Sequence, residues 1–251
     1  MQHWPRAKNA DYTPLLVVGM YRSGTTLTEH ILSAHPDIEP GGESPAMPEA
    51  IRALAESLGD ISNFPASMHA VTPEIIQQAS DVYHSRLLDH ADQGQFIVDK
   101  LPMNYLNLGL ASLLLPNARV LHLVRDPLDT ALSCYSQAFA SQMSFTADMN
   151  HLGHAIAQQR RIMSHWSNTI DLPLLEVSYE TLASEPDSTL RNIFEFIGIP
   201  WDDVVLRFHE VTRVAATPSM DQIRQPINTQ AINRAAAFDA HLEPIKRALK
   251  N

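Results

Sequence analysis

Four short apolar runs are spaced along the chain, and each has the length of a buried β-strand. They cover residues 15–20, 95–98, 118–124 and 174–177. The segments between them carry apolar residues every three to four positions, which is the period of an amphipathic α-helix. Strands that alternate with helices favour βαβ units. The pattern therefore predicts an α/β domain in which a parallel sheet is flanked by helices.

Prolines, glycines and short polar side chains indicate where the helices begin and end. Thr72 and Asp126 each precede a proline, so each is expected to cap a helix that starts at that proline. Residues 36–48 contain four prolines and the pair Gly41-Gly42, so we expect a loop there. Helices are expected over about residues 27–35, 48–58, 73–87, 103–115, 148–170, 188–197 and 202–209, and from residue 127.

A residue with ligand-binding potential follows each predicted strand. These residues are Arg22, Lys100, Arg125 and Tyr179, in chain order. Parallel strands end at the same edge of a sheet, and the ligands of such sheets bind at that edge. We therefore expect the four side chains to surround one ligand site.

The charge balance and the cysteine count narrow the class of protein. The 251 residues include 18 Lys+Arg and 28 Asp+Glu, a net charge of −10, which disfavours a nucleic-acid binder. No early apolar run is long enough to cross a bilayer, and residues 1–14 do not resemble a signal peptide, so no membrane partner is expected. The single Cys134 cannot form an intrachain disulfide, so a cytoplasmic location is expected. The 12 histidines lack zinc-site spacing, so no metal is expected.

The segment from Gly19 to Thr26 has the spacing of a phosphate loop, with Thr25 where a nucleotide triphosphatase carries its lysine. Gly24 permits a tight turn, so the amides from Ser23 to Thr26 can point into one concavity at a helix N-terminus. Arg22 adds a full positive charge beside it. The loop therefore suits a ligand with one phosphate here rather than a triphosphate chain. The alternative is an ordinary junction between a strand and a helix.

A second candidate anion site lies in the segment R-D-P-L-D-T-A-L-S. Arg125 leaves the third predicted strand, and Ser133 lies about two turns into the following helix. Both side chains could reach a second phosphate. The alternative is that Arg125 forms an ion pair with Asp129 while Ser133 packs within the protein.

Together the two constellations resemble the sulfotransferase family, whose donor is 3′-phosphoadenosine 5′-phosphosulfate (PAPS). The stretch V-V-G-M-Y-R-S-G-T-T-L resembles the family's 5′-phosphosulfate loop, and V-L-H-L-V-R-D-P-L-D-T-A-L-S resembles its 3′-phosphate motif. The stretches A-H-P-D-I-E-P-G-G-E-S, D-K-L-P and S-M-D-Q-I-R-Q-P-I-N are most similar to protein-tyrosine sulfotransferases and related bacterial sulfotransferases. The likeness runs from about residue 14 to residue 245.

The resemblance implies a fold like that of the phosphate-loop NTPases and one sulfotransferase domain over residues 1–251. A helical insertion over about residues 40–95 would face the acceptor, and residues from about 212 to 251 would cover the nucleotide. The implied reaction moves a sulfuryl group from PAPS to an acceptor hydroxyl and leaves the bisphosphate PAP. Tyrosine, a sugar and a small metabolite stay open as acceptors, and so does a homodimer.

The resemblance also assigns roles to residues at the matching positions. Glu43 resembles the general base. Lys100, the one lysine away from the two ends of the sequence, would stabilise charge on the bridging oxygen with help from Ser219. Donor-binding roles fall on Arg22, Ser23, Gly24, Thr25, Thr26, Arg125, Ser133, Tyr179, Arg224 and Arg234. For most of these the alternative is an ordinary packed or surface side chain.

Two departures and two rival functions remain. Tyr21 stands where relatives commonly have proline, and Gln137 stands where some carry a second basic residue. The run 96–99, apolar residues followed by Asp99, resembles the element that holds Mg²⁺ in NTPases, which supports a phosphate-loop kinase or nucleotidase. Against it stand the missing loop lysine and the charge of Lys100. The other rival is a nucleotide-binding module without catalysis.

Overall fold

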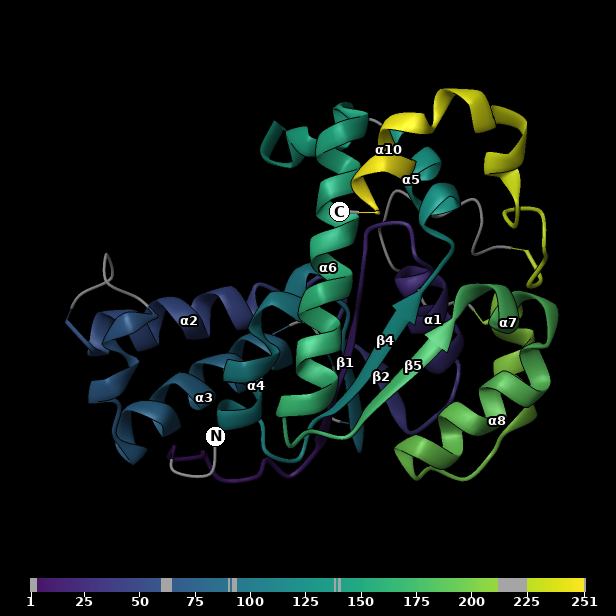
Figure 1. The fold of residues 1–251 in the computed structure, drawn as a ribbon. Helices are drawn as coiled ribbons and strands as arrows, with labels where there is room; N and C mark the ends of the chain where they lie inside the picture. Colours follow the sequence, from purple (N-terminus) through teal and green to yellow (C-terminus); the bar gives the residue numbers. More distant parts are fainter. Residues whose placement is uncertain are drawn as a thin grey trace.

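One parallel sheet forms the centre of the protein (Figure 1). The structure is a computed structural model, and it describes residues 4–59, 65–89, 91, 94–137, 139, 141–211 and 225–250. Within these residues the sheet has five strands in the order β2-β3-β1-β4-β5. The strands are β1 (Thr13–Gly19), β2 (Ile38–Pro40), β3 (Phe96–Asp99), β4 (Arg119–Val124) and β5 (Leu174–Ser178).

Helices cover both faces of the sheet and its carboxyl edge. Helices α2, α3, α4 and α6 pack on one face, whereas α1, α8 and η5 pack on the other. Helices α5, α10 and η6 pack together beyond the strand ends (Figure 1). The α-helices are α1 (Thr25–Leu32), α2 (Ala46–Ser57), α3 (Pro73–Leu88), α4 (Leu108–Leu114), α5 (Pro127–Tyr135), α6 (Met149–Thr169), α7 (Tyr179–Ser184), α8 (Pro186–Ile197) and α10 (Glu243–Ala248). The 3-10 helices are η2 (Ala66–Ala70), η3 (Pro102–Asn107), η4 (Ser141–Ala147), η5 (Asp203–Glu210) and η6 (Arg234–His241).

The central position of β1 follows from its sequence. Leu15, Leu16, Val17 and Val18 are all fully buried, because strands with helices on both faces need apolar side chains in both directions. β1 pairs in parallel with β3 on one side and with β4 on the other. The chain segments that follow β1, β3 and β4 therefore leave the sheet at neighbouring points of one edge.

Both predicted helix caps are confirmed. The Thr72 side chain accepts a hydrogen bond from the Ile75 amide at the start of α3. The Asp126 carboxylate accepts hydrogen bonds from the amides of Leu128 and Asp129 at the start of α5. These caps fix the directions in which α3 and α5 leave the loops that precede them.

The expectation of a loop throughout residues 36–48 is wrong, because Ile38–Pro40 form the edge strand β2. Proline is tolerated there, since an edge strand leaves one side without ladder hydrogen bonds. β2 pairs with β3 in parallel, with Ile38 opposite Phe96 and Pro40 opposite Val98. The predicted helix at 103–115 is divided between η3 and α4, and the one at 202–209 is the 3-10 helix η5.

Candidate functional site

The predicted phosphate loop joins β1 to α1. Gly24 caps α1 with φ +104, and a Cβ atom there would lie 2.7 Å from Cδ2 of Tyr179. Arg22 also has a positive φ, 67. The side chains of Ser23 and Thr25 are buried, and that of Thr26 is half-buried. The Ser23 amide departs from expectation, because it donates to the Met20 carbonyl at 3.1 Å rather than joining the concavity.

A Gly24→Ala variant is expected to lose both stability and affinity for a phosphate ligand. The backbone at this position has φ +104, a conformation that costs about 1–3 kcal/mol for residues other than glycine. The added methyl group would also clash with the Tyr179 ring. Urea denaturation would measure the first effect and calorimetry with PAP the second. Unchanged PAP affinity in a folded variant would contradict a role of this turn in binding.

The two predicted anion sites meet across the β1 and β4 ends. The Arg22 Nε atom donates to the Ser133 hydroxyl on α5 at 3.1 Å, and Arg125 Nη1 donates to the Arg22 carbonyl at 2.9 Å. The Tyr179 ring lies under the Arg125 guanidinium at 4.7 Å. Burial lowers the Arg22 pKa, and the nearby charge of Arg125 lowers it further. Two half-buried cations held this close attract an anionic ligand.

Arg125 does not pair with Asp129, so that alternative is wrong. The Arg125 Nη2 atom donates to the Ala231 carbonyl at 2.5 Å, and its Nε is buried with no hydrogen-bond partner among the described residues. Asp129 instead accepts from the amides of Asn233 and Ala235, at 2.6 and 2.7 Å. Arg125 and Asp129 therefore both hold the C-terminal segment at the end of the sheet, a role that the sequence analysis missed for Asp129.

The predicted residues of the C-terminal segment are less well placed. Arg234 begins η6 with an exposed side chain, one residue before the amide that Asp129 binds. Arg234 lies three residues after Ala231, whose carbonyl accepts from Arg125, but among the described residues no hydrogen bond or ion pair joins it to Arg125. Ser219 and Arg224 lie outside the described residues. Their roles stay predictions.

Glu43 and Lys100, to which the resemblance assigns separate catalytic roles, lie in contact. Lys100 Nζ is 2.6 Å from Oε1 of Glu43. The Lys100 side chain is fully buried, whereas that of Glu43 is 50% exposed. The pair is fixed through the backbone as well, because the Lys100 amide donates to the Gly42 carbonyl at 3.0 Å. The base candidate is therefore open to an acceptor, and its cation lies behind it.

A second carboxylate, Glu29 on α1, completes this group and was missed. Its Oε1 accepts from the Gly42 amide at 2.9 Å, and its Oε2 lies 3.8 Å from Lys100 Nζ. Burial raises the pKa of Glu29 to about 7, although the Lys100 charge and the Gly42 hydrogen bond oppose the rise. The signal in the sequence was its spacing: Thr25, Glu29 and Leu32 share one buried face of α1.

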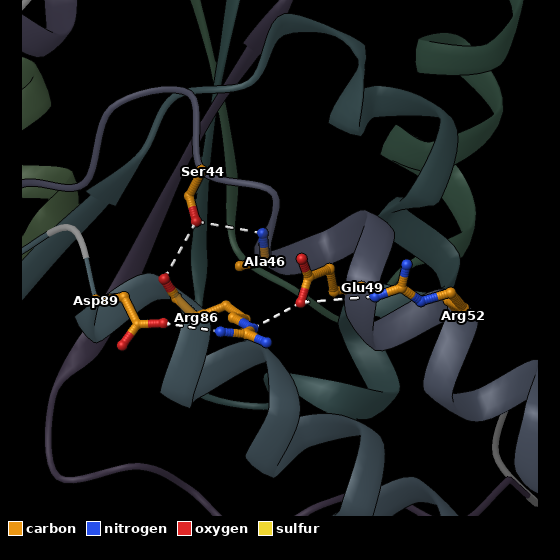
Figure 2. A network of polar contacts seen from close by, with 6 residues as sticks. All are labelled: Ser44, Ala46, Glu49, Arg52, Arg86 and Asp89. Carbon is orange, nitrogen blue, oxygen red and sulfur yellow. Dashed lines mark hydrogen bonds and ion pairs between the residues drawn. The ribbon is translucent and has the colours of Figure 1, made fainter.

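The loop that carries Glu43 is anchored on both sides. Figure 2 shows the downstream anchor, where the Ser44 hydroxyl lies between the Ala46 amide and the Arg86 carbonyl of α3. The Arg86 side chain in turn contacts Glu49 of α2 at 2.6 Å and Asp89 at 3.1 Å. These exposed ion pairs contribute little stability individually. Their effect is to join the start of α2 to the end of α3 beside the candidate base.

Asp99 does not occupy a metal-binding position toward the phosphate loop. Its Oδ2 accepts from the Tyr83 hydroxyl at 2.8 Å and from Asn104 at 3.2 Å, on the sheet face covered by α3. Lys100, the next residue, turns toward α1 because successive side chains alternate across a strand. The structural argument for the kinase or nucleotidase alternative is therefore weakened.

The buried carboxyl of Asp99 leads to a prediction about stability. Burial raises its pKa from 3.8 to about 7. Its contribution to stability is therefore fully present below about pH 4 and is lost as pH rises through about 7. Compared with Asp99→Asn, the wild type should lose a few kcal/mol more unfolding free energy between pH 4 and pH 8. Urea denaturation at several pH values tests this, and parallel profiles would contradict it.

Comparisons with known proteins identify the family of this chain. A model of the sulfotransferase family matches residues 14–203. The chain belongs to the sulfotransferase family. Among the described residues no helix has the length and apolar character needed to span a membrane.

Several relatives are known. An uncharacterized protein of Aquifex aeolicus is 34% identical over 94% of this chain and 32% of its own length. Protein-tyrosine sulfotransferase 1 of Danio rerio is 25% identical over 92% of this chain and 67% of its own. Protein-tyrosine sulfotransferase A of Caenorhabditis elegans is 27% identical over 87% and 60%. The chain therefore spans between one third and two thirds of the length of these relatives.

Solved structures support the fold. The sulfotransferase domain of the Synechococcus PCC 7002 olefin synthase superposes with a TM-score of 0.65 and 21% identity. That comparison covers 99% of this chain and 97% of the other. The sulfotransferase domain of the curacin biosynthetic pathway gives a TM-score of 0.57 at 14% identity over 97% and 98%. The predicted parallel sheet with a phosphate-loop sulfotransferase architecture is confirmed.

Proposed function

We propose that the protein transfers a sulfuryl group from PAPS to the hydroxyl of an acceptor. The observation that carries the proposal is the Glu43–Lys100 contact of 2.6 Å, made at the end of β3 beside β1, the strand that leads to Arg22. A base with a buried cation behind it is suited to move a proton and to stabilise a leaving oxygen in one step.

The donor would be held by the two anion sites. Arg22 and the amides at the start of α1 suit the 5′-phosphosulfate, because a helix N-terminus and a cation both favour negative charge. Arg125 and Ser133 suit the 3′-phosphate, and the Tyr179 ring beneath Arg125 suits the adenine or that phosphate. The buried Nε of Arg125 has no partner among the described residues, which supports a donor role toward an anion.

The chemical step is an in-line displacement at sulfur. The acceptor oxygen forms a bond to sulfur while the bond from sulfur to the bridging oxygen of the 5′-phosphate breaks. The electron pair stays on PAP, where Lys100 would stabilise the developing charge. The acceptor proton passes to Glu43, whose half-exposed side chain an acceptor can reach. Ser219 is proposed to assist Lys100.

The acceptor is proposed to reach Glu43 between the phosphate loop and the helices of residues 40–95. The protein-tyrosine sulfotransferases among the relatives support a peptide tyrosine as the first acceptor to test. Sugar and small-metabolite hydroxyls remain alternatives. A cytoplasmic location, a homodimer, the absence of a metal and the covering role of residues 212–251 stay predictions.

Transfer of labelled sulfate from PAPS tests the proposal directly. A panel of tyrosine peptides, sugars and small phenols would serve as acceptors, and calorimetry would compare PAP with ATP–Mg²⁺. We expect labelled product with at least one class and tighter binding of PAP. Preference for ATP–Mg²⁺ would favour the kinase or nucleotidase alternative, and PAP binding without any transfer would favour a non-catalytic nucleotide-binding module.

A further inference from the structure

We infer that Glu29 is a positioning residue that holds Lys100 and the Glu43 loop in the arrangement needed for transfer. The inference rests on the proposed function for its consequence in catalysis. Its structural basis is independent of that function, because it consists of contacts between three segments. These are α1, the end of β3 and the loop after β2.

Gly42 is the point at which the three segments meet. Its amide donates to Glu29 at 2.9 Å, and its carbonyl accepts from the Lys100 amide at 3.0 Å. Gly42 has φ +64, so its backbone turns at this residue and directs Glu43 back toward Lys100. The Glu29 carboxylate thus fixes the residue that immediately precedes the candidate base.

The same carboxylate also acts on the buried cation. Glu29 Oε2 lies 3.8 Å from Lys100 Nζ and has no hydrogen-bond partner among the described residues. The Glu29 side chain is 1% exposed, and that of Lys100 is fully buried. A cation buried to this extent needs an opposite charge that stays in place, since an unpaired buried charge is strongly unfavourable.

Turnover removes the other counter-charge. When Glu43 accepts the acceptor proton, it becomes neutral, and the contact of 2.6 Å to Lys100 loses its ionic character. Lys100 is then free to move toward the bridging oxygen. The Glu29 carboxylate remains beside it and keeps the ammonium group oriented at that moment. Above about pH 7, where Glu29 is charged, the exposed carboxylate thus takes the proton while the buried one keeps its charge.

The pH dependence follows from the groups around Glu29. Lys100 at the end of β3 stabilises its charge, whereas Glu43 and Asp99 disfavour that charge. Burial outweighs these effects and raises the pKa of Glu29 to about 7. The charge beside Lys100 is therefore present above about pH 7 and disappears as the pH falls through that value.

The Glu29→Gln variant separates the effect of the negative charge from that of the hydrogen bond to Gly42. Its side-chain oxygen can still accept from the Gly42 amide, but it carries no charge. At pH 8 we expect kcat to fall about 10-fold, with the acceptor KM and the PAP Kd within about twofold of wild type. The inflection of kcat near pH 7 should disappear. Glu195→Gln on the exposed side of α8 is the matched control and should keep both the rate and the inflection.

Amide hydrogen exchange, measured without substrate, tests whether Glu29 holds the loop through Gly42. In Glu29→Leu the amides of residues 41–44 should exchange about 10-fold faster than in wild type, whereas Glu29→Gln should stay close to wild type. If the Leu variant does not fold, the same comparison is made with Glu29→Ala, and the Gln variant still tests the charge. Wild-type kcat and an unchanged pH profile in Glu29→Gln would overturn the role of the charge.

A failure of the proposed function can be distinguished from a failure of the inference about Glu29. If the wild type transfers no sulfate to any acceptor, the proposed function fails. The exchange measurement then still decides whether Glu29 holds the loop. Unchanged exchange at residues 41–44 in the Leu or Ala variant overturns the inference even in an active sulfotransferase.

Discussion

A Glu43→Gln variant is expected to bind PAP as the wild type does and to turn over about 10²–10⁴ times more slowly. Lys100 donates to Glu43 at 2.6 Å, and a glutamine at this position can still accept that hydrogen bond. The loop should therefore keep its position. What the variant lacks is a group that can take the acceptor proton. Steady-state sulfate transfer measures the rate, and calorimetry measures PAP affinity.

The control for this experiment is Glu56→Gln, an exposed carboxylate of α2 that undergoes the same chemical change. It should retain wild-type turnover. Equal turnover in Glu43→Gln and the wild type would remove Glu43 from the mechanism. A parallel loss of PAP affinity would instead indicate that the loop had moved.

An Arg125→Ala variant should bind PAP about 10 to 100 times more weakly and AMP only slightly more weakly. AMP lacks the 3′-phosphate, so the difference between the two ligands isolates the contact that Arg125 is proposed to make. Comparing the loss of PAP affinity with the loss of AMP affinity is necessary because Arg125 also donates to the carbonyls of Arg22 and Ala231. Any general disturbance of the loop should weaken both ligands equally.

Arg125→Lys serves as the companion variant. It keeps the positive charge but loses the planar guanidinium that reaches two carbonyls at once. We expect a PAP affinity between those of wild type and Arg125→Ala. Equal losses of PAP and AMP in the alanine variant, measured by calorimetry, would refute the assignment of Arg125 to the 3′-phosphate.

Features set by neighbouring residues were predictable from the sequence. The apolar run of residues 15–20 indicated a buried strand, and Asp126 followed by Pro127 indicated the start of a helix. The edge strand β2 was not predictable in this way. Its three residues end in Pro40, and its strand partner is β3, which lies more than fifty residues further along the chain.

The site was predictable as far as strand ends determine it. Arg22, Lys100 and Arg125 follow neighbouring parallel strands, so their placement at one edge required only the order of the sheet. The partners of each side chain depend on tertiary packing instead. Glu29 resembled one more helical carboxylate, and its contact with Gly42 depends on where the β2 loop crosses α1. Asp129 was a candidate partner for Arg125 but binds two amides more than a hundred residues away.

That attachment of Asp129 has a practical consequence for handling the protein. A single side chain at the first turn of α5 ties down the chain near Ala235, and α5 also carries Ser133. Tags, fusions or deletions at the C-terminal end are therefore expected to disturb the proposed donor site through α5, without touching a nucleotide. Purification handles belong at the other end of the polypeptide whenever donor affinities are to be compared.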